Sequence, residues 1–154
     1  MSARADPMRL VVRPTGDAKR LLEGGILRLT GAARCHRCPL ADDRALIEQI
    51  KLMQPQFILT LGAYLPSFMA PLSPALKHVW SGVKSLTMLD EKGDALVFPS
   101  FFEGVLHPIA VVALTHPAYR HVNVKYRQYG NLQGDEAERA LVRDALVQNA
   151  HDSE

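Results

Sequence analysis

The spacing of hydrophobic positions predicts that helices and strands alternate along the chain. From Ala41 to Met53, apolar residues recur three and four positions apart, which is the pattern of a helix with one buried face. Phe57 to Leu61 and Val111 to Thr115 are short, almost entirely apolar runs bounded by proline or glycine. Runs of this kind are typical of strands covered on both faces, as in a parallel sheet.

Weaker patterns predict the remaining elements. Lys84 to Leu89 and Ala95 to Phe98 flank a polar segment and predict a β-hairpin with Gly93 in its turn. Asp135 to Gln148 is expected to form the last helix, capped by its first residue, with the Glu138 side chain reaching back in a capping box. Two further strands and two short helical segments are expected at Arg9 to Val12, Ile26 to Thr30, Asp17 to Glu23 and Ala63 to Ala70.

This alternation favours an α/β fold with a mainly parallel sheet. The chain has 154 residues, of which 47% are hydrophobic and 22% are charged. These values suit one globular domain over residues 1–154, with residues 1–8 expected to be disordered. We find no apolar run that could span a membrane and no signal-peptide pattern, so a cytoplasmic protein is expected. The net charge of +2 does not by itself indicate a nucleic-acid partner.

His116 and Pro117 follow the second apolar run directly, so the histidine is expected just beyond the carboxyl end of a strand. In open parallel sheets, ligands bind at this end of the strands. Gly62 follows the first apolar run in the same way, and a glycine would let a ligand approach the backbone closely. We expect Gly62 and His116 to open on one cleft. The chain also contains His107-Pro108, so a His-Pro dipeptide could instead do no more than terminate a strand.

Two segments resemble motifs of the uracil-DNA glycosylase superfamily. Leu59-Thr60-Leu61-Gly62-Ala63-Tyr64 resembles the phosphate loop of the family, and Thr115-His116-Pro117-Ala118 resembles its histidine-proline-serine motif. Both segments follow predicted strands in the family's order, and the predicted helix before them ends at Gln54-Pro55, as is usual in the family. The resemblance covers residues 26 to 146.

The resemblance implies a three-layer α/β/α fold with a four-stranded parallel sheet. It also implies that uracil or a related base is flipped out of DNA into a pocket at the strand ends, because the glycosidic bond is unreachable inside a duplex. His116 would donate to a carbonyl oxygen of the base as negative charge develops there. Ala118 to Asn123 would form the wedge that enters the DNA. The expected DNA contacts at these motifs are Gly62, Ala63, Pro117, Ala118, Tyr119 and Asn123.

The segment from Tyr119 to Tyr129 adds positive charge and aromatic rings. It contains Arg120, Lys125, Arg127 and three of the four tyrosines, and no acidic residue. Cations neutralise phosphates and aromatic rings stack on bases, so we expect these three basic residues to contact DNA. The alternative is a solvated surface loop whose tyrosines pack on the last helix.

The chain also departs from the family's pattern. The loop that carries the family's water-positioning residue has no clear counterpart, which leaves Asp17 as the nearest carboxylate for a catalytic role. Ala63 and Ala118 replace serines of the two motifs, so two hydroxyl contacts are lost. These departures keep a second function open, in which the protein binds DNA through a glycosylase fold without excising a base.

Cys35 and Cys38 have the spacing of metal ligands. The resemblance suggests that they are a remnant of an iron-sulfur site. Zinc and iron-sulfur sites need about four protein ligands, so two cysteines cannot complete one in a monomer and no cofactor is expected. A small metal or redox protein built around these cysteines is a third interpretation.

Overall fold

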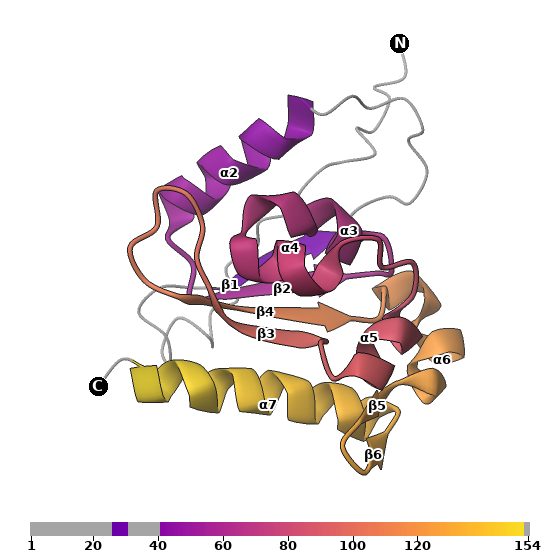
Figure 1. Ribbon diagram of the computed structural model, residues 1–154. Coiled ribbons are helices and arrows are strands. Elements are labelled where there is room, and N and C mark those ends of the chain that lie inside the picture. The colour runs from indigo at the N-terminus through magenta and orange to yellow at the C-terminus, as the bar shows by residue number, and fades with distance from the viewer. Residues whose placement is uncertain (1–25, 31–40, 153–154) are drawn as a thin grey trace.

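Four strands form the main sheet of the protein: β1 (Ile26–Thr30), β2 (Phe57–Leu61), β4 (Ile109–Leu114) and β3 (Leu96–Ser100), in this order across the sheet (Figure 1). The computed structural model describes residues 26–30 and 41–152. β1, β2 and β4 run parallel, whereas β3 is antiparallel to β4. The carboxyl ends of the three parallel strands therefore lie at one edge of the molecule.

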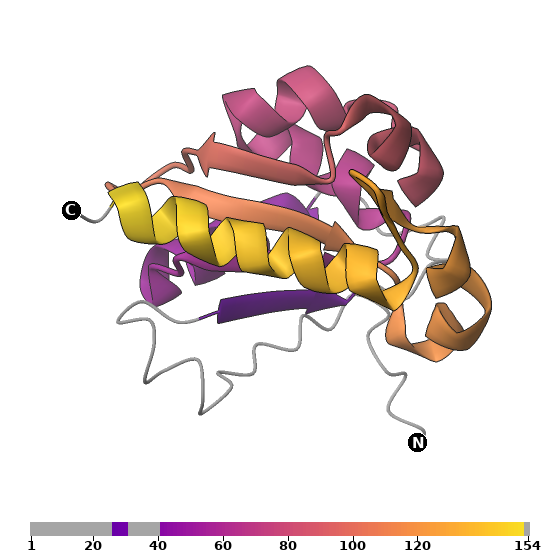
Figure 2. The same ribbon diagram turned by 90° about the horizontal axis from the view of Figure 1, so that it is seen from below.

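Helices cover both faces of this sheet. α2 (Ala41–Met53), α3 (Leu65–Met69) and α4 (Pro74–Trp80) lie on one face, and α7 (Asp135–Asp152) runs across the other (Figures 1 and 2). None of the helices in the described ranges is both long and apolar enough to cross a bilayer. The shorter elements are η1 (Ala70–Leu72), α5 (Leu86–Lys92), η2 (Pro117–Tyr119), α6 (Arg120–Asn123), η3 (Val124–Tyr126), β5 (Gln128–Tyr129) and β6 (Leu132–Gln133).

The core is built around β4, whose residues are all buried up to Ala113. Polar groups inside the core have partners on neighbouring strands and loops. The Thr60 hydroxyl of β2 donates to the carbonyl of Val112 at 3.2 Å, and the indole nitrogen of the fully buried Trp80 donates to the Asp94 carbonyl at 2.8 Å. Because buried polar groups are costly without partners, these bonds favour one arrangement of the layers.

The mixed α/β class predicted from the sequence is confirmed. Three predicted elements have the expected bounds, namely Ile26–Thr30, Ala41–Met53 and Phe57–Leu61. The last strand of the sheet begins at Ile109 rather than Val111, and the last helix ends at Asp152 rather than Gln148. The disorder expected for residues 1–8 and the elements predicted at Arg9 to Val12 and Asp17 to Glu23 lie outside the described residues.

The predicted β-hairpin is wrong. The segment of its first arm forms the helix α5 instead. Ser85 caps the start of this helix, because its hydroxyl oxygen accepts a hydrogen bond from the backbone nitrogen of Met88 at 3.3 Å. Gly93 ends this helix in the left-handed conformation, with φ of 73°, instead of forming a hairpin turn. The second arm is a strand, β3, but it pairs with β4 in the antiparallel direction. The fully parallel four-stranded sheet that the resemblance implies is therefore not found in the described part of the chain.

Candidate functional site

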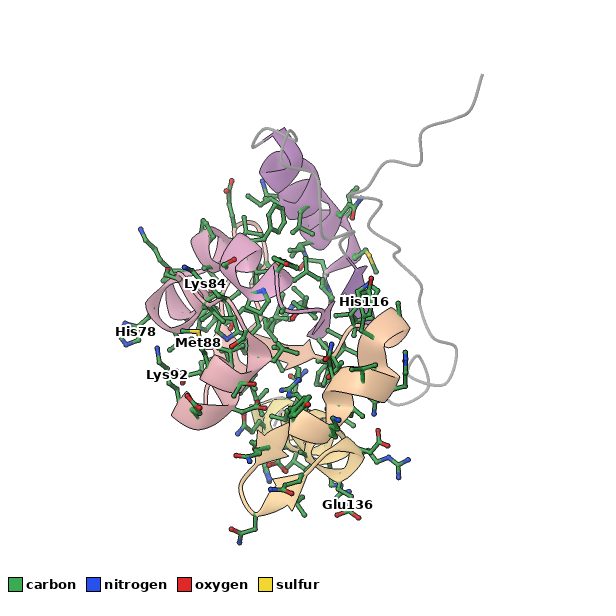
Figure 3. All side chains as sticks on the ribbon, turned by 90° about the vertical axis from the view of Figure 1, so that its right-hand side faces the viewer. His78, Lys84, Met88, Lys92, His116 and Glu136 are labelled. Carbon is green, nitrogen blue, oxygen red and sulfur yellow. The ribbon has the colours of Figure 1, made fainter. Side chains whose placement is uncertain are left out.

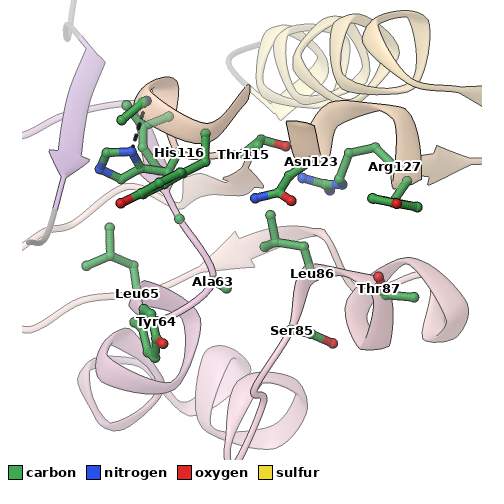
Figure 4. A pocket seen from close by; sticks show the side chains of 15 residues that line it. Ala63, Tyr64, Leu65, Ser85, Leu86, Thr87, Thr115, His116, Asn123 and Arg127 are labelled. Carbon is green, nitrogen blue, oxygen red and sulfur yellow. Dashed lines mark hydrogen bonds between the residues drawn. The ribbon is translucent and has the colours of Figure 1, made fainter. Parts of the chain in front are cut away.

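A cavity of about 540 Å³ opens at the carboxyl ends of β2 and β4 (Figure 4). Its walls come from the loop after β2, the short helices after β4, and the start of α5. The lining residues are Leu61, Gly62, Ala63, Tyr64, Leu65, Ser85, Leu86, Thr87, Thr115, His116, Ala118, Tyr119, Asn123, Tyr126 and Arg127. A cavity of this size at this edge of a sheet is typical of a small-ligand site.

His116 is held at the wall of the cavity by the turn that follows it. Its Nδ1 accepts a hydrogen bond from the backbone nitrogen of Ala118 at 3.0 Å, which caps the 3-10 helix η2 (Figure 4). A nitrogen that accepts a hydrogen bond carries no proton, so the neutral imidazole bears its proton on Nε2. No residue in the described ranges bonds Nε2. His116 can therefore donate a hydrogen bond from Nε2 to a ligand.

Gly62 lies directly against the His116 ring. The Gly62 nitrogen donates to the Leu114 carbonyl at 2.9 Å, which joins the end of β2 to the end of β4. A Cβ atom at Gly62 would lie 3.5 Å from Cδ2 of His116, and φ at Gly62 is +118°. Glycine adopts this conformation at least cost. The expectation that Gly62 and His116 open on one cleft is confirmed.

The helix that follows Gly62 offers one backbone donor fewer to an anion. That helix, α3, has Pro66 as its second residue, and proline lacks a backbone N–H. Ala63 lines the cavity without offering a side-chain hydroxyl. Because the Gly62 nitrogen already donates to the Leu114 carbonyl, a phosphate contact at these two residues rests on the backbone of Ala63 and stays a prediction.

His107, in the second His-Pro dipeptide, links two segments of the fold. It precedes β4 at the opposite end of the strand, and its Nε2 is 2.9 Å from the Pro55 carbonyl oxygen. This bond joins the loop before β4 to the segment before β2. The two dipeptides therefore differ in surroundings, because only His116 lies at the cavity.

A buried ion-pair cluster, formed by Asp90, Arg127 and Glu138, borders the cavity through Arg127. The Arg127 side chain is 2% exposed, and its Nε and Nη2 each donate to one carboxylate oxygen of Asp90 at 2.9 Å. Its Nη1 donates to the Ala113 carbonyl at 2.9 Å and to Glu138 at 3.4 Å. The prediction that Arg127 contacts DNA phosphates is wrong, because two carboxylates already bind its guanidinium away from solvent.

Glu138 connects this cluster to the segment that carries His116. It is 4% exposed, and its carboxylate accepts hydrogen bonds from the backbone nitrogen of Thr115 at 2.9 Å and from the Thr115 hydroxyl. The predicted capping box is wrong, because this carboxylate reaches across to the end of β4 instead of back along its own helix. The backbone nitrogen of Glu138 donates to the Gly134 carbonyl instead. Glu138 thereby fixes the residue immediately before His116.

Arg120, at the start of α6, donates to the carboxylates of Asp135 and Glu138. Partial burial lowers the pKa of Arg120, but the hydrogen bonds and charges of these carboxylates outweigh burial and raise that pKa above its ordinary value. Its side chain is 39% exposed, so a DNA contact stays a prediction for this residue. Most of its charge is compensated within the protein.

The remaining predicted contacts lie around the cavity mouth. Tyr119 and Asn123 are exposed and line the cavity, as does Ala118. Pro117 is exposed beside them, and the wedge segment forms the short helical turns η2 and α6. Lys125 is exposed, and its Nζ lies 5.0 Å from the ring centroid of Tyr126. No carboxylate among the described residues pairs with it.

One wall of the cavity was not predicted from the sequence. It is formed by Ser85, Leu86 and Thr87 at the start of α5, a segment predicted to be a strand. A serine at position 85 and a glycine eight residues later are the signals of a helix cap at each end, and they could have identified this helix.

Asp17, Cys35 and Cys38 lie outside the described residues. Within the described ranges, no three His, Cys, Asp or Glu side chains are grouped so that they could hold a metal ion. No Asp or Glu among these residues lines the cavity either.

Comparison with known proteins finds no matching family model, no similar curated protein and no similar solved structure.

Proposed function

We propose that the cavity is a nucleobase site and that the protein is a DNA base-excision glycosylase of the uracil-DNA glycosylase type. The base would be uracil or a related base flipped out of DNA. The observation that carries this proposal is the bond from the Ala118 nitrogen to Nδ1 of His116, which leaves Nε2 as a donor at the cavity wall.

The chemistry of base excision needs such a donor. When the N-glycosidic bond breaks, negative charge develops on the leaving base and is shared by its carbonyl oxygens. A donor that the backbone already holds in place stabilises this charge without reorganising in the transition state. The neutral imidazole of His116 would supply that donor from Nε2.

The surroundings of His116 also support a base as the ligand. The cavity combines apolar walls from Leu61, Leu65 and Leu86 with the polar side chains of Ser85 and Asn123. This mixture suits a flat ring with carbonyl and N–H groups at its edge. The carboxyl-end location of the cavity and the helices on both sheet faces agree with the three-layer glycosylase fold that the resemblance implies.

A second candidate is a DNA-binding or regulatory module that keeps the base site without excision. The observation that favours it is that no carboxylate among the described residues lines the cavity. Hydrolysis needs a residue that positions and activates water. Asp17 is the residue expected from the sequence for this task, so Asp17→Asn tests whether it activates the water, and product from the wild type separates the two candidates.

The test is a strand-cleavage assay. End-labelled oligonucleotides with one uracil, single-stranded or opposite guanine or adenine, are incubated with the protein and then treated with alkali. We expect alkali-labile product from the wild type, and about a hundredfold slower formation by His116→Ala. His78→Ala is the matched control, because His78 is exposed on α4 and does not line the cavity.

Each outcome assigns one candidate. Product that depends on His116 but not on His78 supports the glycosylase, and loss of product in Asp17→Asn supports water activation by that residue. Retention of the oligonucleotides in a gel shift, with no product, supports the binding module. Equal product from wild type and His116→Ala contradicts the proposed role of the cavity.

A further inference from the structure

Three tyrosines surround the mouth of the cavity and leave their rings in solvent. Tyr64, Tyr119 and Tyr126 are 66%, 60% and 59% exposed, and all three line the cavity. Their hydroxyl groups have no hydrogen-bond partner in the described part of the chain. Tyr129 behaves differently, because it is partly buried and its hydroxyl donates to Asp144 at 2.5 Å. The three exposed rings therefore contribute little to the stability of the fold.

These rings come from two sides of the cavity. Tyr64 lies in the loop after β2, whereas Tyr119 and Tyr126 belong to the short helices after β4. The Tyr119 ring also packs beside His116, with 5.7 Å between the ring centroids. A strand whose base enters the cavity would thus meet aromatic rings on both sides of its point of entry.

Exposed aromatic rings at such positions suit unstacked bases. Proteins that hold single strands stack successive bases on aromatic side chains, and this contact tolerates any sequence because every base has a π-face. In a duplex, those faces are already stacked on neighbouring base pairs. The arrangement of the tyrosines therefore favours a single strand over a duplex.

The charges near the cavity indicate that phosphates are the smaller source of affinity. Arg120 and Arg127 are bound by carboxylates of the protein. Lys125 lies beside the Tyr126 ring, and Lys84 projects on the same side of the molecule as His116 (Figure 3). A few exposed lysines can neutralise a few phosphates of a single strand, whereas the two compensated arginines add little.

We propose that Tyr64, Tyr119 and Tyr126 form a stacking platform for single-stranded DNA, on which the bases that flank the cavity-bound base are held. This inference rests on the proposed function, because it takes the cavity to hold a base. It adds that the DNA binds as a single strand and that these three tyrosines select the single strand over a duplex.

The test measures binding by fluorescence anisotropy. The probes are a labelled oligothymidylate with one central deoxyuridine, the same strand with abasic spacers in place of the flanking thymidines, and the first strand paired with its complement. The central residue carries a 2′-fluorine, so that excision does not consume it. The spacer strand keeps the phosphates and removes the stacking partners, so it tests the platform on the unmodified protein.

We expect the spacer strand and the duplex each to bind at least about fivefold more weakly than the oligothymidylate. Tyr64→Leu and Tyr126→Leu should each weaken oligothymidylate binding by a similar factor and leave spacer-strand binding unchanged. Tyr129→Phe is the control, because Tyr129 does not line the cavity, and it should bind all three probes like the wild type.

Equal affinity for the spacer strand and the oligothymidylate would overturn the platform, and so would tighter binding of the duplex. Neither result would affect the excision assay, which tests the base site through His116. Conversely, tyrosine-dependent binding of single strands, together with product formation that is equal in wild type and His116→Ala, would retain the platform and contradict the proposed function.

Discussion

At the scale of single residues, the position of His116 depends on charges that are buried beneath it. Glu138 accepts hydrogen bonds from the nitrogen and the hydroxyl of Thr115, and it also contacts the guanidinium groups of Arg120 and Arg127. Each of these groups would be costly to bury alone. Together they fix the backbone immediately before His116 while keeping their charges compensated.

Glu138→Gln should therefore be strongly destabilising. The amide oxygen can still accept from Thr115, but the negative charge that compensates Arg127 and Arg120 is lost. We expect the free energy of unfolding to fall by about 3 kcal/mol, measured by urea denaturation. Glu136→Gln is the matched control, because Glu136 is exposed on the same helix (Figure 3) and should cost less than about 0.5 kcal/mol. Equal losses in the two variants would contradict the role given to Glu138.

His116 and Arg127 differ in how far their positions could be predicted from the sequence. His116 could be located because its signal is local, an apolar run interrupted by a proline. The contacts of Arg127 could not be predicted, since Asp90 lies 37 residues before it and Glu138 lies 11 residues after it. Its own segment contains no acid, so the arginine was expected on the surface. Long-range ion pairs of this kind leave no pattern in the neighbouring sequence.

At the scale of elements, α5 decides the shape of the cavity, because its first turn supplies one wall. This segment was predicted to be a strand because it is short, contains apolar residues and precedes a glycine. Tertiary packing instead buries Leu89 against the core, and Ser85 and Gly93 cap the two ends of the helix. Helix α2 was predicted correctly because its period extends over several turns, which a helix as short as α5 cannot show.

Gly93 should behave as a helix cap in mutational tests. Gly93→Ala places a side chain in the left-handed conformation and should cost about 1 kcal/mol of unfolding free energy. A Cβ atom at this position would meet nothing within 4 Å, so the cost arises from the backbone alone. Gly93→Asn should cost less, because asparagine tolerates this conformation better. The measurement is thermal or urea unfolding, and equal cost for both variants would contradict the assignment.

The hairpin of β5 and β6 is attached to α7 through Tyr129, which makes the link sensitive to alkaline pH. Burial, together with the hydrogen bond and charge of Asp144, raises the pKa of Tyr129 to about 12. The folded state thus holds the phenol proton more tightly than the unfolded chain, whose pKa is about 10. The stabilising contribution is complete below pH 10 and is lost as the pH rises from about 10 to about 12.

The test of this link compares the wild type with Tyr129→Phe. Ultraviolet titration of tyrosinate should show that the tyrosine ionising at the highest pH is missing in the variant. Urea midpoints should fall more steeply for the wild type than for Tyr129→Phe above about pH 10. Parallel pH profiles for the two proteins would show that Tyr129 does not stabilise the attachment of the hairpin.

At the scale of the whole molecule, the candidate site exists because distant segments end at the same edge of the sheet. Gly62 and His116 were expected to meet if the two strands before them are parallel neighbours, and β2 and β4 do pair in parallel. The antiparallel direction of β3 could not be predicted, because an antiparallel edge strand covered by helices has no separate apolar pattern. The helices after β4, which complete the cavity mouth, were expected only as a basic loop.

We propose that a base from DNA enters this cavity and accepts a hydrogen bond from Nε2 of His116. Long-range nitrogen–proton correlation spectra of the imidazoles test this hydrogen bond at about pH 8, where an ordinary imidazole is neutral. The protein has six histidines, and loss of one set of signals in His116→Ala assigns that residue. The ligands are a single-stranded oligonucleotide with one 2′-fluorodeoxyuridine, whose glycosidic bond resists cleavage, and the same strand with an abasic site there.

We predict that free His116 carries its proton on Nε2, and that this nitrogen and its proton shift when the fluorodeoxyuridine strand binds. The abasic strand should leave them in place, and the His107 signals should not move with either ligand. DNA binding that leaves His116 unchanged, or that shifts it equally with both strands, would contradict the account.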